Sequence, residues 1–99
     1  MKICGYKTKP DFTNDIRMGI VLDSGEIIDP NLVKTLLYEK EGRFNPHQRA
    51  NQKIPTSLHS FLQTSDNPIE ELKEVLESYE ILREAGTTNL KNGTSVILT

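Results

Sequence analysis

This 99-residue sequence lacks the features that most directly reveal a catalytic or membrane protein. A single cysteine, Cys4, excludes an internal disulfide and indicates a reducing compartment. No apolar run approaches the roughly 18 residues of a membrane span, and the N-terminus turns polar too early for a signal peptide. A cysteine pair, a glycine-rich phosphate loop and a serine nucleophile elbow are also missing. The sequence therefore predicts a soluble, cytoplasmic chain without a catalytic set of its own.

The sequence also lacks a strong charge of either sign. It has 12 Lys and Arg against 14 Asp and Glu, which gives a net charge of −2 at pH 7. A nucleic-acid duplex or an anionic membrane would attract a basic surface, so neither is expected as a partner. A chain of this length is expected to form one small domain.

The clearest positive pattern is a hairpin that leads directly into a helix. Two apolar runs flank an Asp-Ser-Gly turn at residues 23–25, where glycine supplies the left-handed backbone that such loops often need. Asp29 and Pro30 have the residue types of an N-cap and a first helical position. A strand is also predicted over residues 2–6, followed by a polar loop over residues 7–14. The strand before the turn has one apolar row, formed by Ile16, Met18, Ile20 and Leu22.

Apolar spacing predicts two helices with a buried stripe. The first follows the hairpin directly, and its stripe consists of Leu32, Val33, Leu36 and Leu37. The longer one begins at Pro68, where Asn67 and Glu70 complete a capping-box pattern. Its stripe consists of Ile69, Leu72, Val75, Leu76, Tyr79 and Leu82. Each helix is predicted to end at a glycine, at Gly42 and at Gly86.

The region between these helices has weaker patterning. Residues 42–56 are predicted to be a surface loop, because two prolines interrupt a polar stretch with little periodicity. A short helix is predicted over residues 57–63, with Thr56 as its cap. Its expected buried side consists of Leu58, Phe61 and Leu62. Residues 95–98 form a β-prone run without a visible partner. Residues 1–99 thus predict a single α+β domain, a small antiparallel sheet packed by about three helices.

Read in order, three of these segments resemble the N-terminal region of the fumarylacetoacetate hydrolase family. They are the opening strand with the hairpin, the segment at residues 55–62, and the long helix after Asn67. Residues 55–62 are similar to that family's Pro-x-Ser-Leu-x-x-Phe-Leu segment. The resemblance implies an accessory domain of a metal-dependent hydrolase, isomerase or decarboxylase of 2-oxo acids, with a structural or active-site-covering role.

The family's catalytic residues have no counterparts in this chain. Members bind Mg²⁺ or Mn²⁺ through a Glu-x-Glu pair and a later Asp in a β-rich C-terminal domain, which these 99 residues do not include. Glu39 and Glu41 have the letters of that pair, but on a helix end their side chains point apart. The resemblance thus gives this chain no catalytic residue, no metal ligand and no cofactor. It implies a partner, either the catalytic domain of the same protein or a second subunit.

Other acidic residues and histidines do not form an evident site. The glutamates of the long helix recur every three or four residues, which is typical of a solvent face; they are Glu70, Glu74, Glu77, Glu80 and Glu84. His47 and His59 have no third ligand at metal spacing. Both patterns are therefore interpreted as surface features.

One small basic patch remains as a candidate site. Arg43, Arg49 and Lys53 surround the aromatic Phe44. Single-stranded nucleic acid would need more cations and stacking rings than this patch offers. The three cations are therefore candidates for contact with a substrate carboxylate at a neighbouring catalytic domain, or with a partner protein.

Two functions from different classes follow from these observations. The first is the accessory domain that the resemblance implies. The second is a free-standing protein-interaction module that docks a partner through its long helix or through residues 43–53. A small independent enzyme is disfavoured, because no nucleophile–base pair is visible. Exposed apolar surface is expected at residues 96–98 and along the borders of residues 44–54.

Overall fold

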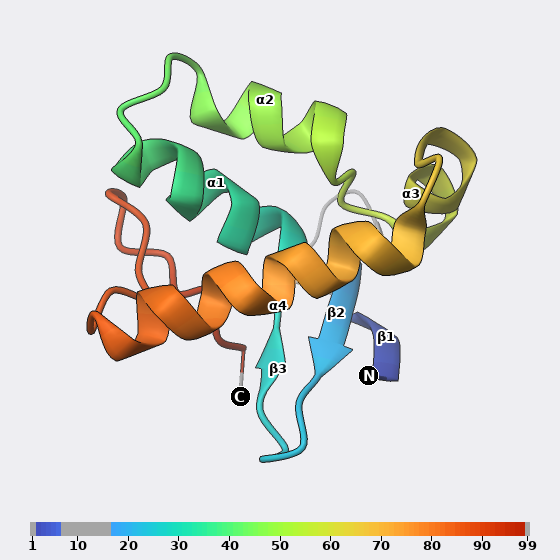
Figure 1. The fold of residues 1–99 in the computed structure, drawn as a ribbon, viewed down its shortest axis with the longest axis horizontal. Coiled ribbons are helices and arrows are strands. Elements are labelled where there is room, and N and C mark those ends of the chain that lie inside the picture. Colours follow the sequence, from blue (N-terminus) through green and yellow to red (C-terminus); the bar gives the residue numbers. More distant parts are fainter. Residues whose placement is uncertain (1, 7–16, 99) are drawn as a thin grey trace.

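The computed structural model describes residues 2–6 and 17–98, and this part of the chain forms one antiparallel sheet and four helices (Figure 1). The strands, hydrogen-bonded in the order β1-β2-β3, are β1 (Lys2–Tyr6), β2 (Arg17–Val21) and β3 (Ile27–Ile28). The helices are α1 (Pro30–Lys40), α2 (Pro46–Lys53), α3 (Leu58–Thr64) and α4 (Pro68–Glu84). The predicted α+β fold class is confirmed. Ile16 and the loop predicted over residues 7–14 lie outside the described residues.

The core lies between the sheet and the helices, with α1 at its centre. α1 packs against α2, α4 and β2. In Figure 1, α2 and α4 lie on opposite sides of α1, and α4 passes in front of the point where β3 leads into α1. The buried apolar cluster consists of Met18, Ile20, Ile28, Val33, Leu36, Ile54, Phe61, Leu72, Val75, Tyr79, Leu82, Leu90 and Val96. Strands, helices and the segment after α4 therefore all contribute to one core.

The predicted hairpin and helix start are confirmed. Gly25 has a φ of +91°, and the amide of Leu22 donates to the carbonyl of Glu26 at 2.8 Å to close the turn. Asp29 caps α1, because its Oδ1 accepts a hydrogen bond from the amide of Leu32 at 3.1 Å. The hairpin thus delivers the chain directly into α1.

The buried stripes of α1 and α4 are largely as predicted. Val33 and Leu36 are buried on α1, and the buried residues of α4 are Leu72, Val75, Tyr79 and Leu82. Leu76 is partly buried against the core. The placement of Ile69 in the stripe was wrong, because it is 53 % exposed. The buried side of α4 starts one turn later, at Leu72.

The surface loop predicted for residues 42–56 was wrong, because it contains helix α2. Asn45 adopts a left-handed backbone with a φ of +52°, and Pro46 then starts the helix. Ala50 is the buried residue of α2. A helix that buries one small side chain shows no apolar stripe in its sequence, and this explains the error.

One predicted cap was wrong, and a second occupies its predicted position without the expected side-chain bond. Ser57, not Thr56, caps α3, since its hydroxyl accepts a hydrogen bond from the amide of Ser60 at 3.1 Å. The carbonyl of Thr56 is used elsewhere, by the amide of Met18 at 2.6 Å. At the start of α4, Asn67 makes no side-chain cap bond.

The predicted buried side of α3 was only partly right. Phe61 is fully buried, but Leu58 is 37 % and Leu62 is 55 % exposed. A seven-residue helix at the edge of the core thus buries one side chain and leaves two leucines in contact with solvent.

The terminal run has a partner that the sequence did not reveal. The amide of Leu98 donates to the carbonyl of Ile27 at 2.7 Å, and the amide of Asp29 donates to the carbonyl of Val96 at 3.0 Å. Ile28 and Ile97 form an antiparallel bridge between these bonds. Val96 is fully buried, so the expected exposure of residues 96–98 was wrong. The partner lies about 70 residues away in sequence, beyond the reach of local patterns.

Candidate functional site

The three cations of the predicted basic patch are exposed, and each has a partner within the chain. Arg43, after α1, donates from Nε to Glu41 Oε1 at 2.7 Å. Arg49 of α2 donates from Nε to the carbonyl of Phe44 at 2.6 Å. Lys53 Nζ lies 3.2 Å from Glu71 Oε1 on α4. The structure thus brings Arg43 and Arg49 to the same turn but directs Lys53 towards α4.

These pairings keep the patch charged but lower its net charge. The hydrogen bond to Glu41 raises the pKa of Arg43, and the hydrogen bond to Glu71 raises the pKa of Lys53. Arg43 and Lys53 therefore each lie beside a carboxylate that offsets their charge, whereas Arg49 donates to a carbonyl. Phe44, at 79 % exposed, is the most prominent apolar side chain of this surface.

The carboxylates and histidines considered at the sequence level are dispersed over the molecule. Glu39 Oε1 accepts a hydrogen bond from the amide of Lys91 at 3.0 Å, whereas Glu41 pairs with Arg43. His47 and His59 are exposed on different helices. In residues 2–6 and 17–98 no three His, Cys, Asp or Glu side chains form a group that could hold a metal ion.

The sequence patterns did not reveal a partly buried polar network centred on Asp29 and Asn31. Arg17 Nε donates to Asp29 Oδ2 at 2.8 Å, and an Arg17 terminal nitrogen donates to Asn31 Oδ1 at 3.2 Å. Asn31 Nδ2 in turn donates to Asn51 Oδ1 at 2.9 Å and to the carbonyl of Ile54 at 2.7 Å. These bonds link β2, the start of α1 and the end of α2, so the network has a structural role.

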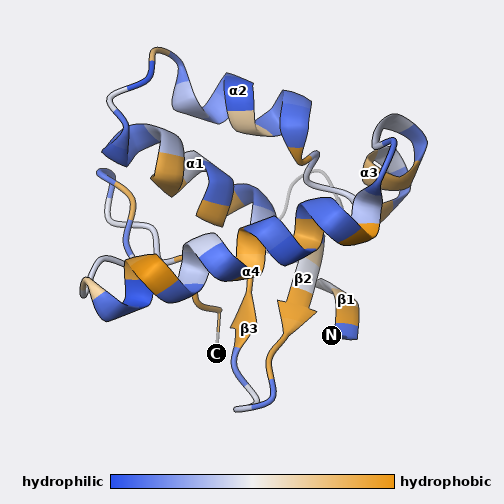
Figure 2. Cartoon of the chain, viewed as in Figure 1, coloured by the Kyte–Doolittle hydropathy of each residue, from blue (hydrophilic) through white to orange (hydrophobic). Residues whose placement is uncertain are grey.

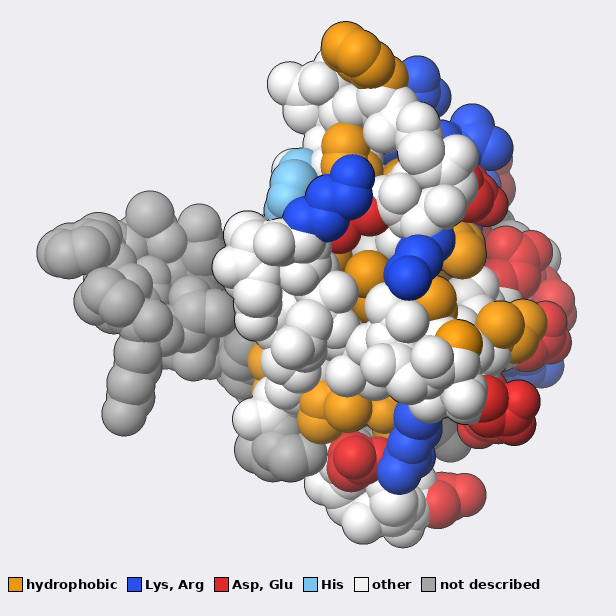
Figure 3. All heavy atoms as spheres, turned by 90° about the vertical axis from the view of Figure 1, so that its left-hand side faces the viewer, with side chains coloured by type: hydrophobic (Ala, Val, Ile, Leu, Met, Phe, Trp, Pro, Cys, Tyr) orange, Lys and Arg blue, Asp and Glu red, His pale blue; other side chains and the backbone are white. Residues whose placement is uncertain are grey.

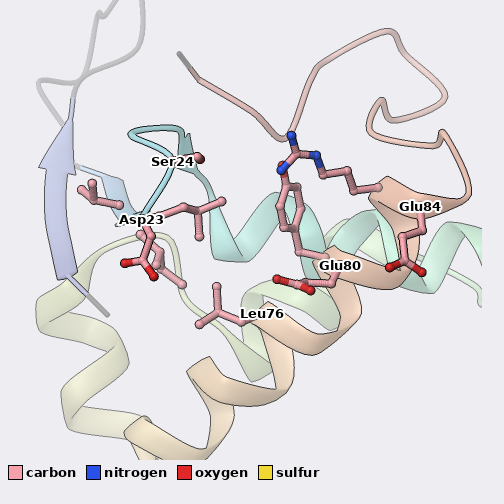
Figure 4. A pocket seen from close by; sticks show the side chains of 10 residues that line it. Asp23, Ser24, Leu76, Glu80 and Glu84 are labelled. Carbon is pink, nitrogen blue, oxygen red and sulfur yellow. The ribbon is translucent and has the colours of Figure 1, made fainter.

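A concave surface runs along α4. One hollow of about 470 Å³ lies between residues 20–24 of the hairpin and α4. A second of about 480 Å³ lies beside it, bordered by Glu77 and Ile81. Both are lined by Leu76, Glu80 and Glu84, so they form one continuous depression, which we call the α4 groove. Figure 4 shows its first hollow, with Asp23 and Ser24 of the hairpin on one side and Leu76, Glu80 and Glu84 of α4 on the other.

The α4 groove combines apolar walls with an acidic rim. Leu22 and Leu76, both half-buried, provide apolar surface in the first hollow. The acidic side chains that line the two hollows are Asp23, Glu77, Glu80 and Glu84. Among the described residues that line the two hollows, Arg83 is the one cation, and its terminal nitrogen lies 3.0 Å from Glu26 Oε1. The groove is therefore electronegative and suits a ligand that is both cationic and apolar.

Tyr79 adds a buried polar atom to this site. Its side chain lines the first hollow and is 2 % exposed. Its hydroxyl has no hydrogen-bond partner among the described residues. Burial raises the pKa of Tyr79, and the charge of Glu26 raises it further, while Arg83 opposes the shift. A buried hydroxyl without a partner costs about 1–3 kcal/mol, so a ligand that supplied one would gain from it.

Exposed apolar side chains border the groove. Ile81 is 69 % exposed and forms part of the second hollow. Figure 3 shows hydrophobic side chains directly beside acidic ones at the edge of the displayed face.

The predicted solvent face of α4 is confirmed, because all five of its glutamates considered above are exposed: Glu70, Glu74, Glu77, Glu80 and Glu84.

None of the helices in the described part of the chain has the length and apolar character needed to cross a membrane. Comparisons with family models, with curated proteins and with solved structures found no significant similarity to this chain.

Proposed function

We propose that this chain is an accessory α+β domain that packs on a catalytic partner domain and performs no catalysis itself. The resemblance of the hairpin and of residues 55–62 to the fumarylacetoacetate hydrolase family supports this proposal. In that arrangement the partner domain carries the Mg²⁺ or Mn²⁺ site and acts on 2-oxo acids in the cytoplasm. The partner is the catalytic domain of the same protein or another subunit of a homo-oligomer.

The observation that carries the proposal is the α4 groove with its exposed isoleucine. Scattered apolar side chains are normal on a protein surface. Here Ile81, at 69 % exposed, adjoins a depression whose walls include Leu76 and Leu22. A concave surface with apolar walls and an acidic rim is typical of a docking site.

Sequencing of the encoding locus tests the accessory-domain proposal most directly. We expect the reading frame to continue into a β-rich segment with a Glu-x-Glu pair. The joined protein should then show metal-dependent turnover of acylpyruvates, and the 99-residue chain should show none. Hydrogen exchange should be slower in α4 of the joined protein than in the separate chain. Turnover by the purified chain itself would refute the proposal.

A free-standing interaction module is the second candidate, and Phe44 favours it. This side chain is 79 % exposed beside Arg43 and Arg49, on a surface apart from the α4 groove. A docking site there would make Phe44→Ser the most damaging surface substitution for partner binding. If Ile81→Ser is the more damaging change, the groove is the docking surface and this alternative fails.

A further inference from the structure

We propose that the α4 groove receives a basic amphipathic segment of the partner, with a lysine or arginine in the first hollow and an apolar side chain against Ile81. This inference rests on the proposed function, because it gives the chemistry of the surface that meets the groove. Three features support it: the negative charge of the rim, the position of the apolar walls, and the buried Tyr79 hydroxyl, which has no partner among the described residues.

The charge of the groove favours a cation. Asp23 approaches from the hairpin, and Glu80 and Glu84 approach from α4. In Figure 4, Leu76 lies between the carboxylates of Asp23 and Glu80. The lining cation Arg83 already lies against Glu26, so these exposed carboxylates remain for an incoming positive charge. Charge complementarity of this kind selects partners and steers their approach.

The apolar walls favour a side chain with a long aliphatic part. Lysine and arginine pack their stems on apolar surface while the charged end stays among polar groups. Leu22 and Leu76 supply such a surface next to the carboxylates. Leu76 also lines the second hollow, which ends at the exposed Ile81. Two adjacent hollows suit two side chains three or four residues apart on one helix face.

The Tyr79 hydroxyl is a second and independent indication of a ligand. It is a buried polar atom without a partner among the described residues, and the Tyr79 residue lines the first hollow. The Arg83 side chain beside it is 55 % exposed, so it can move aside without loss of core packing. An ammonium or guanidinium group in the hollow could then donate a hydrogen bond to the hydroxyl oxygen, which relieves the cost of leaving it unpaired.

A second copy of the chain is a weaker occupant. Its exposed Phe44 with Arg43 and Arg49 would offer both apolar and basic groups. Arg43 and Arg49, however, already bond to Glu41 and to the Phe44 carbonyl. Docking of a copy would therefore break both of these contacts, whereas a separate basic segment would displace one exposed arginine, Arg83, from Glu26.

The test uses a fluorescent synthetic peptide whose helix has a leucine face and a lysine face, and a matched peptide with glutamate in place of lysine. The 99-residue chain is titrated with each peptide, and binding is followed by fluorescence anisotropy. We expect saturable binding of the lysine peptide that weakens with added salt, because the carboxylates are exposed and screened. The glutamate peptide should not bind.

Matched variants locate the binding. Glu80→Gln with Glu84→Gln removes two groove charges, and Glu70→Gln with Glu74→Gln removes two charges from the same helix outside the groove. Loss of one exposed ion pair weakens peptide binding by up to about fivefold. The affinity for the lysine peptide should therefore fall about tenfold in the groove variant and about twofold or less in the control. Tyr79→Phe keeps the ring and should weaken binding about two- to tenfold.

Several results would overturn the inference. One is an equal loss of peptide affinity in the two double variants, and another is the absence of saturable binding of the lysine peptide. A third is that the peptide shifts backbone NMR signals in residues 43–53 alone. A dimer in sedimentation that excludes the peptide would identify a second copy as the occupant. The inference alone fails if α4 is protected in the joined protein but the lysine peptide does not bind. The proposed function fails if the locus encodes no catalytic domain, whatever the peptide does.

Discussion

Helices α2 and α4 both pack on α1, but different interactions hold them. α4 places four side chains in the core, whereas Ala50 is the buried residue of α2. Figure 2 shows α2 as hydrophilic along most of its length. Polar contacts fix its end instead, because Asn31 of α1 donates to Asn51 Oδ1 and to the Ile54 carbonyl.

This difference shows two ways to attach a helix to the same neighbour. Burial of each large apolar side chain of α4 contributes about 1.5–3 kcal/mol, and the total is spread over several turns. A hydrogen bond contributes about 0.5–1.5 kcal/mol net, but a buried amide left without its partner costs more. α4 is therefore held by many contacts, while α2 depends strongly on Asn31.

The largest expected effect is loss of a core contact of α4. Leu72 is 1 % exposed, and Leu72→Ala should lower the free energy of unfolding by about 2–5 kcal/mol, because a cavity replaces its side chain. Phe61→Ala on α3 should cost a similar amount. Urea unfolding followed by circular dichroism measures both changes.

Leu62→Ala is the matched control for these two variants. Leu62 neighbours Phe61 but is 55 % exposed, so its loss should cost much less. If Leu62→Ala destabilises as much as Leu72→Ala, the assigned buried faces of the helices are incorrect.

The next effect is specific to α2. Asn31 is 4 % exposed, and Asn31→Ala should cost about 1–3 kcal/mol, because Asn51 and the Ile54 carbonyl both lose their donor. Hydrogen exchange should accelerate mainly in α2 and remain slow in α4. Equal acceleration in both helices would show that the two are not held independently.

The same comparison explains what the sequence could predict. The hairpin at Gly25, the Asp29 cap and the stripe of α4 depend on local residue types and spacing. The first two are confirmed, and the stripe is confirmed except for its first member, Ile69. α2 was missed because Asn31, a polar residue in another helix, anchors it. Its Asn-Pro start was interpreted as a loop signal, although proline also begins helices.

The candidate site was predictable only in part. The exposure of the α4 glutamates follows from their spacing, and it is confirmed. The α4 groove also needs residues 20–24 of the hairpin, which approach α4 only through the tertiary fold. The burial of the Tyr79 hydroxyl without a hydrogen-bond partner among the described residues likewise depends on neighbours distant in sequence. Such non-local geometry leaves no periodic signal along the chain.

A smaller effect concerns Tyr79, where a polar atom lies within the apolar side of α4. Its pKa is raised by burial, so the unfolded chain loses the hydroxyl proton at a lower pH than the folded chain does. Tyr79 therefore lowers stability as the pH rises above the ordinary tyrosine value of 10.0. Tyr79→Phe should remove this alkaline loss and raise stability at neutral pH by about 1 kcal/mol, because it removes a buried hydroxyl that has no partner among the described residues. Urea unfolding at several pH values measures the difference, and identical alkaline profiles would contradict it.

The smallest effect tests the direct link between α2 and α4. Lys53 Nζ of α2 lies 3.2 Å from Glu71 Oε1 of α4, and the lysine side chain is 50 % exposed. An exposed pair of this kind contributes about 0.2–1 kcal/mol and is screened by salt. A double-mutant cycle with Lys53→Met and Glu71→Gln should give a coupling energy in this range that falls at high salt. Glu71 Oε2 also accepts a hydrogen bond from Ser65 Oγ at 3.1 Å, so the cycle is needed to separate the two interactions. A larger coupling that persists at high salt would show that charge pairing, more than Asn31, attaches α2 to the rest of the fold.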